Sequence, residues 1–127
     1  NLYGAKLEGA NLYGAKLDHI KADLWMILTV AQTEVLGLRN AQREGRVDGS
    51  AYEGECCCLL GTIANLSECN YNQIPGLKPD PNRPAERWFL AITPGTPVEH
   101  PVVKLTLEWI DEWCERNGVE VPKEVIS

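Results

Sequence analysis

Residues 102–117 read VVKLTLEWIDEWCERN, and this stretch decides the fold. Apolar side chains recur every three or four residues, and acidic side chains fill the positions between them, which is typical of an amphipathic helix. Gly118 supplies the stop. Trp109 and Trp113 share the apolar face, so we expect this helix to be the main structural clamp of the domain.

Two helices are expected upstream, within residues 21–49. Asp23 is a suitable N-cap for a first helix whose apolar stripe begins at Leu24, and Thr33 is a suitable cap for a second. A single helix kinked near residue 32 is the alternative. Glycines after the second helix then provide its exit.

A third helix is expected between Cys56 and Leu66, where the sequence is almost continuously apolar. Short apolar runs are ambiguous, so a buried strand over residues 56–64 is the alternative. Pro84 suits the first turn of a further helix over residues 84–93. Proline-rich loops at 70–84 and 93–101 separate these helices.

The opening of the chain has a different period. Residues 1–20 read NLYGAKLEGANLYGAKLDHI, and a leucine recurs every five residues, at Leu2, Leu7, Leu12 and Leu17. Alanine holds a second slot in the first three units. Neither a helix nor a flat strand has this period, whereas a solenoid stacks short units of apolar and small residues.

These units resemble the pentapeptide-repeat family, whose loose motif A-(D/N)-L-x-x is matched fully by ANLYG at 10–14. The resemblance implies a right-handed four-sided β-helix with the leucines pointing inward, so that residues 1–20 form the last coil of a solenoid. Ile20 then stands where a small residue belongs, and the repeat ends. A lone coil would leave its leucine row uncovered, so we expect a piece of a longer protein, with self-association through Leu2, Leu7, Leu12 and Leu17.

The remainder of the chain, residues 21–127, is expected to form a helical C-terminal domain of four or five helices. The fold class is therefore expected to be mainly α, with a short β-helix coil before the helices. The pattern that includes GTIAN and EWIDEW resembles an uncharacterised domain that can follow pentapeptide repeats in bacterial and phage-like proteins. That resemblance implies no known chemistry.

Charge and composition exclude several classes of protein. The net charge is −6 and no basic stripe is present, so we do not expect direct nucleic-acid binding. No run of about 18 apolar residues exists, so we expect no membrane span. Five cysteines, an odd number without a secretory signal, indicate a reducing compartment, and the expected location is cytoplasmic.

The cysteines are the first candidates for chemistry. Cys56, Cys58 and Cys69 are weak candidates for a metal site, which would need a fourth ligand such as Cys114 or a histidine. The usual spacing of two to four residues between paired cysteines is absent. Because free cysteine commonly behaves as a small buried apolar residue, we expect structural cysteines and no cofactor.

The segment NRPAERWF, residues 82–89, contains the best candidates for protein interaction. Arg83, Arg87 and Trp88 are of the residue types that most often anchor binding surfaces. A local set of salt bridges with Glu86, fixing the preceding loop, is the alternative.

No catalytic residue is expected, because neither a phosphate loop nor a nucleophile with an oriented base is present. The sequence favours a non-enzymatic protein-interaction module that caps a pentapeptide-repeat solenoid. One alternative is a small Cys-dependent metal-binding or enzymatic domain. Another is an acidic phage-type inhibitor of a host nucleic-acid-binding protein.

Overall fold

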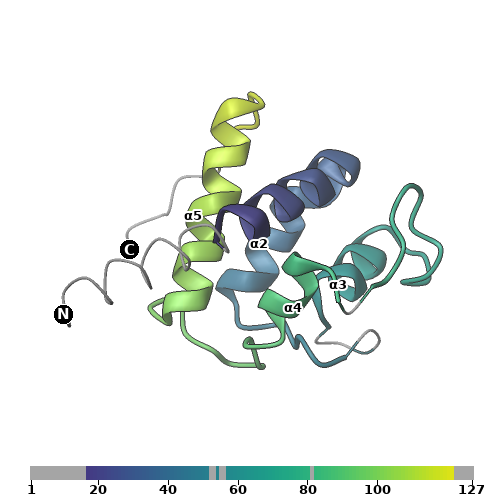
Figure 1. Cartoon of the computed structure of the whole chain (residues 1–127), viewed down its shortest axis with the longest axis horizontal. Helices are drawn as coiled ribbons and strands as arrows, with labels where there is room; N and C mark the ends of the chain where they lie inside the picture. Colours follow the sequence, from purple (N-terminus) through teal and green to yellow (C-terminus); the bar gives the residue numbers. More distant parts are fainter. Residues whose placement is uncertain (1–16, 52–53, 55–56, 81, 122–127) are drawn as a thin grey trace, which may run out of the picture.

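The computed structural model describes residues 17–51, 54, 57–80 and 82–121 of the chain. Residues 17–30 are helical. They are followed by the 3-10 turn η1 (Gln32–Glu34) and by the helices α2 (Val35–Arg43), α3 (Leu59–Leu66), α4 (Pro84–Phe89) and α5 (Pro101–Arg116) (Figure 1). The described part of the chain is therefore mainly α, as expected. Its extended pairing is confined to an isolated parallel bridge between Val47 and Cys57.

The expected coil falls mostly on residues that lie outside the described part of the chain, among them Leu2, Leu7 and Leu12. Residues 17–20 are described and are helical, so the coil does not extend to residue 20 as expected. Leu17 and Ile20 pack against the core. Their spacing to Leu24 and Ile27 follows the three-four pattern of a helix face, which explains why they join the helix rather than a coil.

The two helices expected within residues 21–49 are present, but neither expected cap is used. Asp23 lies inside helix 17–30, and its Oδ2 accepts a hydrogen bond from the backbone N–H of Ala85 at 2.9 Å. Thr33 lies within η1, and α2 begins without a side-chain cap bond. Both cap predictions were wrong because the helix boundaries differ from the expected ones. Helix 17–30 begins well before Asp23, and the tight turn η1 precedes α2.

The third helix is confirmed, although it starts later than expected. The bridge to Val47 holds Cys57 in an extended conformation, and the carbonyl of Cys57 accepts the N–H of Asp48 at 2.8 Å. Cys58 is the extended N-cap residue, and α3 follows it. Residues 57 and 58 therefore cannot be helical, because their backbone is committed to the neighbouring segment.

The fourth helix begins at Pro84 as expected and ends at Phe89, earlier than the expected residue 93. It stops because the chain turns back to meet the segment before α3. Ile92 accepts a hydrogen bond from the N–H of Gly49 at 2.9 Å. That contact ties the exit of α4 to the loop that follows α2.

The closing helix α5 has its apolar face buried, as the sequence predicts. Trp109 and Trp113 are both buried, the latter to 2% exposure. The indole N–H of Trp113 donates to Thr29 Oγ1 at 3.1 Å. The indole N–H of Trp25 donates to the carbonyl of Trp109 at 3.0 Å. These two bonds join α5 to helix 17–30.

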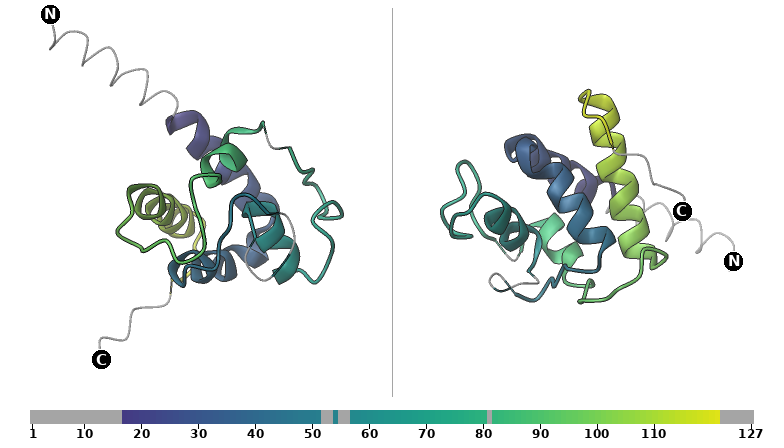
Figure 2. Two further views of the ribbon diagram at one scale, coloured as in Figure 1. Left: turned by 90° about the horizontal axis from the view of Figure 1, so that it is seen from below. Right: turned by 180° about the vertical axis from the view of Figure 1, so that it is seen from behind.

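Residues 67–80 form an irregular segment on the side of the molecule away from α5, as both Figure 1 and Figure 2 show. Ile74 and Leu77 are its buried anchors. Proline and glycine explain the lack of regular structure there. Among the described residues, no helix is both long enough and apolar enough to cross a membrane.

Candidate functional site

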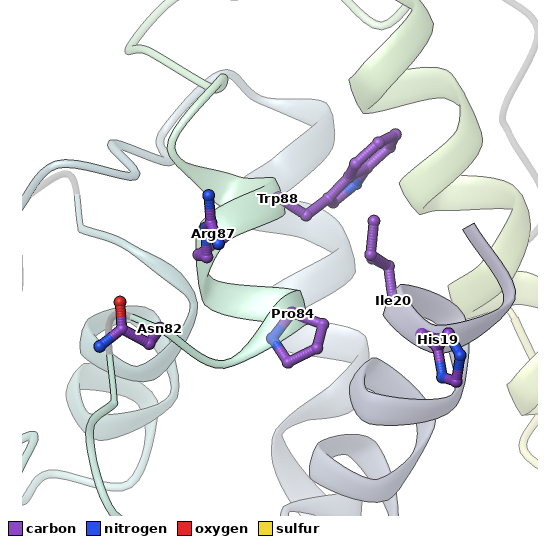
Figure 3. Close-up of a pocket in the computed structure, with 6 residues that line it drawn as sticks. All are labelled: His19, Ile20, Asn82, Pro84, Arg87 and Trp88. Atoms are coloured by element: carbon purple, nitrogen blue, oxygen red, sulfur yellow. The ribbon is translucent and has the colours of Figure 1, made fainter. Parts of the chain in front are cut away.

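A pocket of about 390 Å³ lies between helix 17–30 and α4 (Figure 3). Ile20 points from helix 17–30 toward the side chain of Trp88 on α4. Most of the other lining groups come from α4 and from the residues just before it. The complete described lining is His19, Ile20, Asn82, Pro84, Arg87 and Trp88.

The two walls of the pocket are held together by Asp23. Its carboxylate accepts the N–H of Ala85 in the first turn of α4. Its other oxygen lies 3.5 Å from Arg83 Nε, which makes an ion pair that is too long for a good hydrogen bond. The Arg83 side chain is only 19% exposed. The structure therefore places Arg83 in the connection between the helices, and it is not among the residues that line this pocket.

Arg83 instead lines a second hollow, of about 550 Å³, together with Asp80 and residues 72–74 and 76–78 of the irregular segment. Lys78 and Arg83 bring positive charge to this hollow, and Asp80 brings negative charge. The charges largely offset one another, and the Asp23 carboxylate already neutralises Arg83. This hollow gives no clear preference for an anion or a cation.

Glu86 fixes the segment that precedes α4 by a hydrogen bond. The residue is 4% exposed, and its carboxylate accepts the backbone N–H of Asp80 at 2.8 Å. A buried carboxylate needs such donors to offset the loss of hydration. Glu86 is therefore part of the framework that supports the pocket.

Trp88 is held in one orientation by two contacts on the side that faces α5. Its indole N–H donates to Thr106 Oγ1 at 2.7 Å. Its ring lies 5.3 Å from that of Trp109, between centroids, and is tilted by 40° to it. The half-buried side chain also lines the pocket. An aromatic ring fixed in this way loses little conformational entropy when a ligand contacts it.

Arg87 gives the pocket its charge. It is exposed, and its guanidinium forms no ion pair with any residue in the described part of the chain. His19 is the other ionisable side chain among the described lining residues, and none of them is a carboxylate. The described lining therefore combines apolar side chains with the positive charge of Arg87, inside a protein whose net charge is negative.

The cysteines do not converge on a site within the described residues. Cys56 lies outside them, Cys57, Cys58 and Cys114 are buried, and Cys69 is half-buried. Burial raises the pKa of the Cys58 and Cys114 thiols. No group of three His, Cys, Asp or Glu side chains in the described ranges is placed to hold a metal ion.

The acidic face of α5 is partly neutralised by basic residues from other elements. Arg39 Nε lies 2.6 Å from Asp111, and Lys21 Nζ lies 2.8 Å from Glu112. The hydrogen bond from Lys21 lowers the pKa of Glu112, and Arg116 adds to the effect. Two of the four acids on this helix are thus part of its attachment to the domain.

Sequence reasoning found Arg87 and Trp88 but missed His19 and Ile20, which it assigned to the end of the coil. It also placed His100 in a loop, whereas the structure makes it the N-cap of α5, accepting the N–H of Val102 at Nδ1. Pro101 could have indicated this helix start, because proline is common at the first helical position.

Comparisons of the chain with protein-family models, with curated proteins and with solved structures found no match.

Proposed function

We propose that this domain is a non-enzymatic protein-interaction module that binds a segment of another protein in the pocket between helix 17–30 and α4. The observation that carries this proposal is the setting of Trp88. Its ring is locked by Thr106 and Trp109 on one side and lines an open pocket on the other. Fixed tryptophans beside an arginine are typical of residues that contribute most of the free energy of protein association.

The chemistry of the lining specifies the partner. An apolar side chain of the partner would contact Trp88, Ile20 and Pro84. A carboxylate beside it would pair with the Arg87 guanidinium, which suits carboxylates because it offers two parallel N–H donors. The best occupant is therefore an exposed segment that carries one acidic residue next to a large apolar residue.

The net charge of the whole protein further restricts which partner segments can bind. A net charge of −6 repels a strongly acidic partner at long range. The acidic anchor of the partner should therefore stand among neutral or basic residues. This combination would pair locally with Arg87 without opposing the overall field.

The position of the pocket is consistent with a module that follows a pentapeptide-repeat segment. His19 and Ile20 stand at the end of the repeat-like sequence and belong to the first described turn of the helix. The two other candidate functions have less support. The described cysteines form no ligand group, and two acids of α5 are engaged in ion pairs.

A peptide library displayed on phage and selected on the intact chain tests the proposal. Enriched peptides should share an acidic residue beside an apolar one. Their affinity should fall by about tenfold or more in Arg87→Glu and in Trp88→Ala, as expected for anchor residues.

Arg46→Glu is the matched control, because Arg46 is an exposed arginine away from the pocket, paired with Glu44. It reverses the same charge and should change affinity by less than about twofold. Circular dichroism establishes that each variant is folded. Enriched peptides that bind Arg87→Glu and Trp88→Ala as well as the parent would show that the pocket is not the binding site.

A further inference from the structure

A chain of three hydrogen bonds connects His100 to the pocket tryptophan. Nδ1 of His100 accepts the backbone N–H of Val102 at 3.2 Å. The carbonyl of Val102 accepts the hydroxyl of Thr106 at 2.6 Å, and Thr106 Oγ1 accepts the indole N–H of Trp88 at 2.7 Å. The first turn of α5 thus lies between a titratable imidazole and the ring that lines the pocket.

The first bond of this chain requires a neutral imidazole. A ring nitrogen accepts a hydrogen bond only while it carries no proton, and both nitrogens of the imidazolium are donors. Protonation of His100 would remove the cap of α5. It would also place a positive charge at a helix N-terminus, where the helix dipole is already positive.

We propose that His100 is a positioning residue for the pocket, and that its protonation loosens the first turn of α5 and thereby releases the fixed setting of Trp88. The consequence for ligand affinity rests on the proposed function. The coupling between His100 and Trp88 does not, because it is a property of the unliganded domain. A freed indole loses its preorganisation, so affinity should fall as pH falls.

The effect of His100 has to be distinguished from the effects of other ionisable groups near these three hydrogen bonds. Glu99 precedes it and Lys104 lies one turn along α5, whereas His19 and Arg87 line the same pocket as Trp88. No described side chain of another element forms an ion pair or hydrogen bond with His100. Glutamate, lysine and arginine ordinarily titrate outside the range in which histidines do. His19 is therefore the group that has to be removed.

The test uses the indole N–H signal of Trp88 in the ¹⁵N-labelled intact chain, assigned by its loss in Trp88→Phe. In His19→Asn, this signal should shift when the solution is taken from about pH 8 to about pH 5.5. In the double variant His19→Asn/His100→Asn the titration should vanish. Asparagine retains a side-chain acceptor at the N-cap but does not change its charge.

The indole signal of Trp113 is the internal control, because its N–H donates to Thr29 and lies outside the chain of bonds. It should shift much less than that of Trp88. A titration of the Trp88 signal that persists in the double variant, or its absence in His19→Asn, would overturn the coupling.

Ligand affinity is measured separately, with a library-selected peptide that contains no histidine. In His19→Asn, binding should be about threefold or more weaker at pH 6 than at pH 8, as the loss of one cap predicts. With His100→Asn added, the two affinities should be equal. Equal affinities in His19→Asn itself would refute the effect on binding. If no peptide binds at any pH, the proposed function fails, while the indole titration still decides the coupling.

Discussion

The carboxylate of Asp23 accepts the backbone N–H of Ala85 at 2.9 Å, across 62 residues of sequence. Helix α4 has six residues, and Arg83 at its N-cap makes no side-chain cap bond. A carboxylate from another helix therefore satisfies a donor that the local sequence leaves free. Because the same contact joins both walls of the pocket, its removal should affect stability and the pocket together.

Replacement of Asp23 by alanine should lower the free energy of unfolding by about 1–3 kcal/mol, since it removes a cap and leaves the largely buried Arg83 without its partner. Asp23→Asn should cost less, because its amide oxygen still accepts the Ala85 N–H. Urea unfolding measures both variants. The control is Asp18→Ala, which alters an exposed residue of the same helix and should have a small effect. Equal stability of Asp23→Ala and the parent would contradict the capping role.

Replacement of Gly49 by alanine should destabilise the domain by about 1–3 kcal/mol or more, because an added Cβ would lie 1.7 Å from the carbonyl oxygen of Phe89. The backbone of α4 would have to move. Gly37→Ala is the matched control: its Cβ would meet the tip of Leu66, a side chain 42% exposed that is free to move. Alanine also favours the helix, so this variant should be neutral or more stable. Thermal unfolding should separate the two variants by several degrees.

Replacement of Gln42 by methionine should stabilise the domain by about 1–2 kcal/mol. Gln42 is 1% exposed, and neither its amide nitrogen nor its amide oxygen has a hydrogen-bond partner among the described residues. Methionine has a similar shape and buries no amide. The control is Gln32→Met at an exposed position, for which no change is expected. A loss of stability in Gln42→Met would indicate that a bound water satisfies the amide.

Thiol labelling of the native protein should reach Cys69 first among the described cysteines. Cys69 is half-buried, whereas Cys57, Cys58 and Cys114 are buried. Burial raises the pKa of Cys58 and Cys114, so their reactive thiolate forms are scarce at neutral pH. Mass spectrometry of peptides after brief alkylation gives the order. Labelling of Cys58 as fast as Cys69 would argue against structural thiols.

Stability should decrease in acid partly through Glu112. The pKa of its carboxyl is lowered from 4.5 by the hydrogen bond from Lys21, so the folded state binds a proton less readily than the unfolded chain. The stabilisation that Glu112 contributes is complete above the ordinary pKa of the carboxyl, and it is lost as pH falls through the lowered pKa of the folded state. Lys21→Met should therefore lose less stability than the parent between neutral and acid pH, as measured by urea unfolding. An equal loss of stability in acid in both proteins would exclude the Lys21–Glu112 pair as a source of that loss.

The sequence by itself determined where most of the helices lie. The periodic spacing around Trp109 and Trp113 predicts α5 and its buried face, and Pro84 predicts the start of α4. These features depend on local periodicity and on the fixed backbone of proline, and both can be recognised from the sequence alone. Arg87 and Trp88 were also identifiable, because their residue types favour binding.

Only the tertiary structure decided which distant residues complete the pocket and hold it. The sequence predicts that Asp23 caps its own helix, whereas in the structure it caps α4. Thr106 is a polar residue within an apolar helix face, and in the structure its hydroxyl orients Trp88. Hydrogen bonds between distant segments depend on how helices cross, which local spacing does not encode. Sequence pattern sets the face that each helix buries, whereas the crossing of the helices sets which side chains meet.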